Sequence, residues 1–143
     1  MAVEIRLRYD GNTAVTATHG PSGSMLRTVA PTDNGGDGSS FSPTDLLATG
    51  LASCLLTIMG MKAAKLGVDI SGASARIEKH MSTEPPRRVA RLPLTVSIPV
   101  EPDEALRTEI ETAGRNCPVC KSLSEQVKVE LQIEWGAHAP AAS

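Results

Sequence analysis

Aromatic side chains are almost missing from this sequence, which has one Phe, one Tyr and one Trp in 143 residues. Proteins that bind single-stranded nucleic acid stack bases on aromatic rings, and so few rings cannot form such a platform. A formal net charge of -2 also provides no attraction for a polyanion. We therefore expect no nucleic-acid partner.

The sequence also lacks a long apolar run. Its longest uncharged, mainly apolar stretch spans residues 46–61, whereas a membrane-spanning helix needs roughly 20 such residues. The first residues, MAVEIR, contain no basic region followed by an apolar stretch, so they do not resemble a signal peptide. These absences predict no membrane partner and a cytoplasmic location.

Cysteine is scarce, with Cys54, Cys117 and Cys120 as the three examples. An odd number without a secretory signal argues against a static disulfide framework and for thiols that are free, catalytic or metal-bound. A length of 143 residues is ordinary for one domain with one core. We therefore expect a single domain over residues 1–143.

The first third of the chain has the pattern of a small antiparallel sheet. Apolar and charged residues alternate over 3–9, a turn follows at 10–12, and further strands are expected near 13–18 and 25–29. Residues 31–42 are mostly turn-forming types, which predicts an exposed loop.

A long helix is predicted from Ser42 to about Leu66. Ser42 is a favourable N-cap, Pro43 suits the first helical position, and Asp45 completes a capping box. Gly67 ends the helix. Apolar and small residues cover most of its circumference, which predicts a central helix buried on several sides.

The second half of the chain alternates between strands and one amphipathic helix. Strands are expected around 74–81, 91–100 and 127–135, a helix over 103–114, and a frayed tail over 136–143. The element order is therefore β-β-β-α-β-β-α-β, which predicts an α+β fold with an antiparallel sheet.

Cys54 lies on the apolar stripe of the long helix, one turn after Gly50 and one turn before Ile58. One interpretation is a small buried hydrophobic residue. The other is a reactive thiol. Because a residue in mid-helix gains nothing from the helix dipole, another group would have to activate that thiol.

Cys117 precedes Pro118, which predicts a short helix with Cys117 as its N-cap. The amides at that helix end, with Arg115 and Lys121 nearby in sequence, should favour the thiolate. The C-x-x-C spacing to Cys120 leaves three interpretations open: a turn with two spare thiols, a thioredoxin-like dithiol, and half of a zinc site.

Neither the zinc site nor the thioredoxin-like dithiol is well supported. Zinc needs four ligands, but a second C-x-x-C is missing, and His19, His80 and His138 show no ligand spacing. We therefore expect no metal. A thioredoxin-like motif directly follows a strand and opens a βαβ unit, whereas this one follows a predicted helix late in the chain.

Three segments resemble the OsmC/Ohr family of thiol peroxidases: SPTDLL at 42–47, ASC at 52–54 and CPV at 117–119. Cys54 stands eleven positions after Pro43, and the resemblance extends over nearly the whole chain, including the strand order and the Gly-rich loop before the helix. It implies an intertwined homodimer with sites at the subunit interface.

By the same resemblance, Cys54 is the cysteine that attacks the peroxide and Cys117 is the resolving one. The implied reaction reduces organic hydroperoxides, or hydrogen peroxide, through a sulfenic acid and a Cys54–Cys117 disulfide that an external dithiol reduces. It needs no cofactor and would serve defence against oxidative stress. The alternative function is a non-catalytic OsmC-like dimer that binds a ligand or senses redox state.

The sequence departs from the family's hydroperoxide-resistance branch at two places. That branch has a glutamate ten residues before the reactive cysteine, which holds an arginine that stabilises the thiolate, whereas this sequence has Thr44 there and Asp45 one residue later. Arg27 is the best candidate for the arginine, and Arg91 is the second. Cys120 is an auxiliary thiol that the family pattern does not require, and the chain therefore looks closer to the OsmC-like side of the family.

Overall fold

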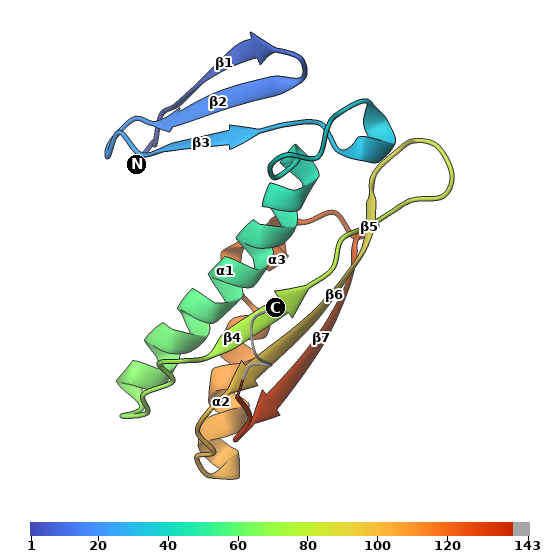
Figure 1. Cartoon of the computed structure of the whole chain (residues 1–143). Coiled ribbons are helices and arrows are strands. Elements are labelled where there is room, and N and C mark those ends of the chain that lie inside the picture. The colour runs from blue at the N-terminus through green and yellow to red at the C-terminus, as the bar shows by residue number, and fades with distance from the viewer. Residues whose placement is uncertain (139–143) are drawn as a thin grey trace. The chain divides into compact units, whose positions relative to one another are not determined.

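The structure is a computed structural model that describes residues 1–138. The predicted frayed tail therefore lies largely outside the described residues. Contacts group the chain into two compact units, Met1–Leu47 and a second unit that begins at Ala48. Mixed helices and strands follow in the expected order (Figure 1), so the predicted α+β class is confirmed.

The first unit contains a three-stranded antiparallel sheet in the order β1-β2-β3. Its strands are β1 (Ile5–Gly11), β2 (Ala14–His19) and β3 (Met25–Thr28). Each lies within two residues of its predicted position. The loop that follows is largely exposed, as expected, but contains one turn of 3-10 helix, η1 (Thr32–Asn34).

One face of this first sheet carries large apolar side chains. The register pairs Leu7 with Ala17 and Ala17 with Leu26, so alternate residues of the three strands share a face. The large apolar side chains on that face are 47–68% exposed: Ile5, Leu7, Tyr9 and Leu26. We call these four residues the apolar sheet face.

Helix α1 (Pro43–Lys65) begins with the predicted capping box. The Ser42 N–H donates to Asp45 Oδ2 at 2.8 Å, and the Asp45 N–H donates to Ser42 Oγ at 3.1 Å. The side chain of each residue thus accepts a hydrogen bond from the backbone N–H of the other. The cap explains why the long loop ends at this point.

Further along α1, the buried residues form one stripe: Ala48, Leu51, Ala52, Leu55, Met59 and Ala63. Ser53, Thr57 and Met61 are exposed in the single chain. By length and composition α1 could cross a membrane, a criterion that the core helix of a soluble protein also meets. Its buried stripe belongs to the core cluster of the second unit, which is the arrangement of a core helix.

The second unit has a four-stranded sheet around β6 (Val89–Ile98). The strand predicted over 74–81 is divided into β4 (Ser74–Ile77) and β5 (His80–Met81), and both pieces pair with β6. Pro93 of β6 lies between the two paired stretches. Because proline has no N–H to donate, the ladder is interrupted at that point.

The last strand, β7 (Lys128–Trp135), pairs with β6 in parallel rather than antiparallel. The sheet of the second unit is therefore mixed, which differs from the predicted antiparallel arrangement. The connection from β6 to β7 contains helices α2 (Glu104–Arg115) and α3 (Pro118–Ser122). A crossover that includes a helix is what allows two strands to pair in parallel.

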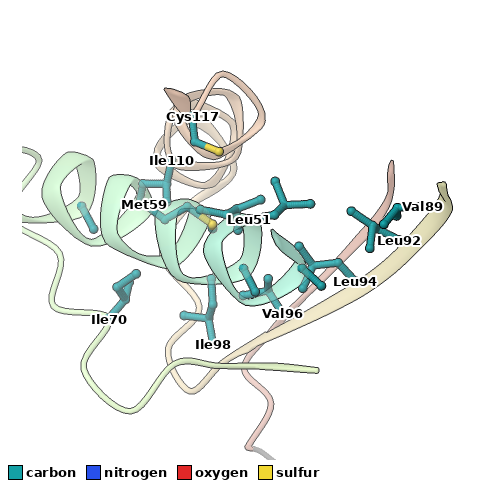
Figure 2. Close-up of a cluster of buried hydrophobic side chains, with 14 residues drawn as sticks. Leu51, Met59, Ile70, Val89, Leu92, Leu94, Val96, Ile98, Ile110 and Cys117 are labelled. Carbon is teal, nitrogen blue, oxygen red and sulfur yellow. The ribbon is translucent and has the colours of Figure 1, made fainter. Parts of the chain in front are cut away.

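The core of the second unit lies among α1, β6 and α2 (Figure 2). Alternate β6 residues supply a fully buried row that is at most 1% exposed: Leu92, Leu94, Val96 and Ile98. Ile110 of α2 and Cys117 are both 0% exposed in the same cluster. The segment that carries Cys117 is therefore held by the core.

Gly114 allows α2 to approach α1 closely. A Cβ at this position would lie 2.7 Å from Met59 Cγ and 3.0 Å from Met59 Sδ. Met59 is 0% exposed and cannot move into solvent. The helix continues through Gly114 to Arg115, whereas the sequence predicted its end at Gly114.

We expect Gly114→Ala to lower the free energy of unfolding by about 1–3 kcal/mol, because the added methyl overpacks the contact with Met59. Thr108→Ala, on the exposed side of the same helix, is the matched control and should be neutral or slightly stabilising. Urea unfolding followed by circular dichroism measures both. Equal free energies of unfolding for the two variants would contradict this prediction, because the contact between Gly114 and Met59 would then accommodate the methyl without loss of stability.

Candidate functional site

Cys117 is the N-cap of the short helix α3, as the sequence predicted. The backbone N–H of Cys120 donates to Cys117 Sγ at 3.4 Å, which closes the first turn of the helix. The Cys117 side chain is 0% exposed and is drawn among the core residues in Figure 2. The thiol thus sits in apolar surroundings with one backbone donor.

Burial raises the pKa of the Cys117 thiol above its ordinary value of 9.0. The amide of Cys120 acts in the opposite direction and lowers the pKa, but burial has the larger effect. This corrects the sequence-based expectation that the helix end would favour a thiolate. Arg115 and Lys121 are exposed, so solvent screens their charges and they offset little of the cost of burial.

Cys54 lies on α1 within hydrogen-bonding reach of Cys117. A side-chain hydrogen bond with Cys54 also raises the pKa of Cys117. Cys54 is half-buried and packs against the core cluster. The structure thus brings together two cysteines that have 62 residues between them in the sequence.

Cys120 completes a cluster of three free thiols. Cys120 is half-buried, whereas Cys117 is buried. A negative charge on Cys120 would raise the pKa of Cys117. The sequence identified Cys120 as an auxiliary thiol, but gave no sign that the buried Cys117 would interact with both of the other cysteines. Only the packing of α3 against α1 reveals this arrangement.

Arg91 lies away from the cysteines' surroundings. Its neighbour Leu92 points into the core, so Arg91 is on the opposite face of the sheet. There Arg91 Nη1 donates to Glu130 Oε2 at 2.9 Å, and Arg91 Nη2 lies 3.4 Å from His80 Nε2. The hydrogen bond from Arg91 is the largest influence that lowers the pKa of Glu130.

Arg27 belongs to the first unit, on the face of β3 opposite Leu26. Its positive charge helps to lower the pKa values of Asp10 and Asp37, although hydrogen bonds from Thr16 and Ser39 are the larger causes. Its guanidinium therefore lies in an acidic neighbourhood. The backbone carbonyl of Arg27 accepts a hydrogen bond from Ser40 Oγ at 3.1 Å.

Thr44 and Asp45 are both part of the start of α1. Asp45 forms the capping box with Ser42, and the Thr44 hydroxyl lies 3.2 Å from Ser42 Oγ. These contacts give both side chains a structural role at the helix cap. Neither contact depends on a thiolate.

Over residues 1–138, no group of three or more His, Cys, Asp or Glu side chains is placed to hold a metal ion. A cleft of about 620 Å³ runs along α1 and the following loop, lined by residues such as Leu56, Gly60 and Val68. None of the residues that line this cleft is a cysteine. The three cysteines of the candidate site therefore do not line this cleft.

Comparison with known proteins places this chain in one family. The model of OsmC-like proteins matches residues 36–132, which include all three cysteines. The chain therefore belongs to the OsmC-like protein family, as the sequence motifs indicated. No curated protein matches the chain.

Solved structures support the same assignment. A Psychrobacter arcticus 273-4 protein named for osmotic stress induction and a detoxification response is 38% identical, with 90% of this chain and 93% of that chain covered and a TM-score of 0.85. The fold is shared with an organic hydroperoxide resistance protein of Legionella pneumophila, 17% identical over 94% of this chain and 97% of that one, TM-score 0.74. It is also shared with OhrB of Bacillus subtilis, 16% identical over 94% and 98%, TM-score 0.69.

Proposed function

We propose that this protein is a cysteine-based peroxidase that reduces organic hydroperoxides and takes part in defence against oxidative stress. The observation that carries the proposal is the contact between the half-buried Cys54 and the fully buried Cys117. A sulfur that reacts with peroxide needs a second thiol within reach to trap its sulfenic acid, and this contact supplies one. The names of the Legionella and Bacillus structures agree with this activity.

In the proposed reaction, the Cys54 thiolate attacks one oxygen of the O–O bond. The bond breaks, the other oxygen leaves as an alkoxide and takes up a proton to become an alcohol, and Cys54 becomes a sulfenic acid. The Cys117 sulfur then attacks the Cys54 sulfur and expels water, which leaves a disulfide. An external dithiol supplies two electrons and two protons that restore both thiols.

The roles follow from the opposite environments of the two sulfurs. Burial raises the pKa of the Cys117 thiol and so favours its protonated form. Cys54 is half-buried and is therefore the more accessible of the two sulfurs. We therefore assign the first attack to Cys54 and the second to Cys117. The free thiols suit the reducing cytoplasm proposed for this chain.

We also propose that the working unit is a homodimer. The apolar sheet face defined above is exposed on the single chain, and a three-stranded sheet needs a covering layer to be stable. Sedimentation at micromolar concentration should give twice the 15.0 kDa mass of one chain. Leu7→Lys, on the apolar sheet face, should weaken the dimer, whereas Thr18→Lys, on the opposite face of that sheet, should not.

A folded wild-type monomer at that concentration would contradict the dimer. So would a Leu7→Lys protein that sediments as the wild type does.

The proposed activity is tested by mixing the reduced protein with cumene hydroperoxide and measuring peroxide loss with and without a dithiol such as dihydrolipoamide or dithiothreitol. Turnover of many equivalents with a dithiol, and a stoichiometric amount without one, is expected. A redox-sensing or ligand-binding dimer would consume no more than a stoichiometric amount under either condition. Peroxide loss no faster than with free cysteine would rule out the enzyme.

A further inference from the structure

Cys117 interacts with both of the other cysteines, and we therefore call it the middle cysteine and Cys54 and Cys120 the outer ones. Cys117 is hydrogen-bonded to Cys54 of α1, and its sulfur accepts the Cys120 N–H at 3.4 Å. The two outer cysteines are half-buried, whereas the middle one is 0% exposed. A reductant in solution can therefore approach either outer sulfur more readily than the middle one.

The burial of Cys117 determines which sulfur is the better leaving group in a Cys54–Cys117 disulfide. Attack on Cys54 would expel the Cys117 thiolate, whose charge is disfavoured by burial. Attack on Cys117 expels the less buried Cys54 instead. No molecule from solution reaches the Cys117 sulfur directly, but Cys120 is already beside it on the same helical turn.

We propose, on the basis of the peroxidase function above, that Cys120 is a third redox residue that moves the disulfide away from Cys54. The Cys120 thiolate attacks Cys117 Sγ, the Cys54–Cys117 bond breaks, and a Cys117–Cys120 bond forms. Cys54 leaves as a thiolate and the proton of Cys120 passes to solvent. The number of disulfides is unchanged, so the step needs no added oxidant or reductant.

The position of Cys120 favours this exchange. Cys117 and Cys120 are separated by two residues in α3, at the N-cap and in the first turn, so bonding them closes a very short loop. Their contact at 3.4 Å between the Cys120 nitrogen and Cys117 Sγ exists before oxidation. The exchange also frees Cys54 before any external dithiol arrives.

A direct consequence is that each chain can consume a second equivalent of peroxide. Once Cys117 is bonded to Cys120, the released Cys54 can attack another peroxide, and its sulfenic acid has no thiol partner left to condense with. The reduced wild-type chain should thus consume two equivalents of peroxide in the absence of a dithiol. The chain without Cys120 should consume one, a twofold difference.

The test is a titration of reduced protein with cumene hydroperoxide, followed by dimedone labelling of sulfenic acid and peptide mapping of disulfides. Wild-type protein should end with a Cys117–Cys120 disulfide and label on Cys54. Cys120→Ser should end with a Cys54–Cys117 disulfide and no label. Ser122→Ala, an exposed position on the same short helix, is the control and should behave as wild type. Acid quenching at early times should trap Cys54–Cys117 before Cys117–Cys120.

Two results would overturn the exchange. One is wild-type protein that stops at one equivalent with the Cys54–Cys117 bond intact. The other is a Cys117–Cys120 bond that forms at the same rate in Cys54→Ser, because the dithiol would then be oxidised directly.

A parallel oxidation with diamide separates the exchange from the peroxidase function, because diamide links thiols without a sulfenic acid. In wild-type protein the bond should again move to Cys117–Cys120, and in Cys120→Ser it should remain at Cys54–Cys117. If this migration occurs while no variant consumes peroxide, the exchange stands and the proposed peroxidase fails. If peroxide is consumed but neither oxidant gives migration, the peroxidase stands and the exchange fails.

Discussion

Cys54→Ser should reduce peroxide consumption to the rate seen with free thiols and should leave no sulfenic acid on the protein. A serine hydroxyl does not ionise near neutral pH, and the thiolate is the form of cysteine that attacks peroxide. Cys117 does not replace Cys54, because it is 0% exposed and burial raises its pKa. Peroxide loss followed with a ferrous-xylenol assay measures the effect.

Cys117→Ser is the informative comparison, because it removes a sulfur from the same cluster without removing the attacking one. This variant should still form sulfenic acid at Cys54, detected by dimedone labelling and peptide mapping, but it should not turn over with a dithiol. Labelling of Cys117 in the Cys54→Ser protein at the wild-type rate would reverse the two roles.

Formation of the Cys54–Cys117 disulfide should accelerate steeply with pH. Cys117 attacks as a thiolate, and burial raises its pKa above the ordinary value of 9.0. Below its pKa the thiolate fraction grows about tenfold per pH unit, so the rate should rise roughly 100-fold between pH 7 and pH 9. The rate of disulfide formation increases with pH because the deprotonated thiolate is the reactive form. Rapid quench at each pH, followed by non-reducing mass analysis, measures this step.

The disappearance of peroxide in the same samples serves as the internal control, since it reports Cys54 and not Cys117. A disulfide-forming rate that levels off below pH 8 would mean that Cys117 ionises more readily than its burial indicates. The helix-end amide would then outweigh desolvation at this site.

Local sequence signals predicted most elements because each depends on a few adjacent residues. The capping box of Ser42 and Asp45 is present as expected, and Asp103 caps α2 through its hydrogen bond from the Leu106 N–H. Pro118 likewise places Cys117 at an N-cap. The family motifs are likewise short local segments, and two of them contain Cys54 and Cys117.

Properties that depend on distant contacts were not predicted. The parallel pairing of β6 and β7 requires knowing that α2 returns the chain to the start of the sheet, although a connection containing a helix is itself a signal for parallel strands. The sequence suggested a thiolate at Cys117 from its neighbours Arg115 and Lys121, but these are exposed whereas the sulfur is buried by residues far away in the chain. The sequence made Arg91 the second candidate to stabilise a Cys54 thiolate, whereas in the structure Arg91 pairs with Glu130 at 2.9 Å.

The central claim is that the Cys54 sulfur is the first group to react with peroxide. Rapid-quench mass mapping tests this claim most directly. Reduced full-length protein is mixed with one equivalent of cumene hydroperoxide in the presence of dimedone, and the labelled peptide is identified as peroxide disappears. The account predicts label on Cys54 with the same time course as peroxide loss, followed in unlabelled chains by a bond to Cys117. Label that reaches Cys117 or Cys120 first, or peroxide that disappears without modification of Cys54, would contradict it.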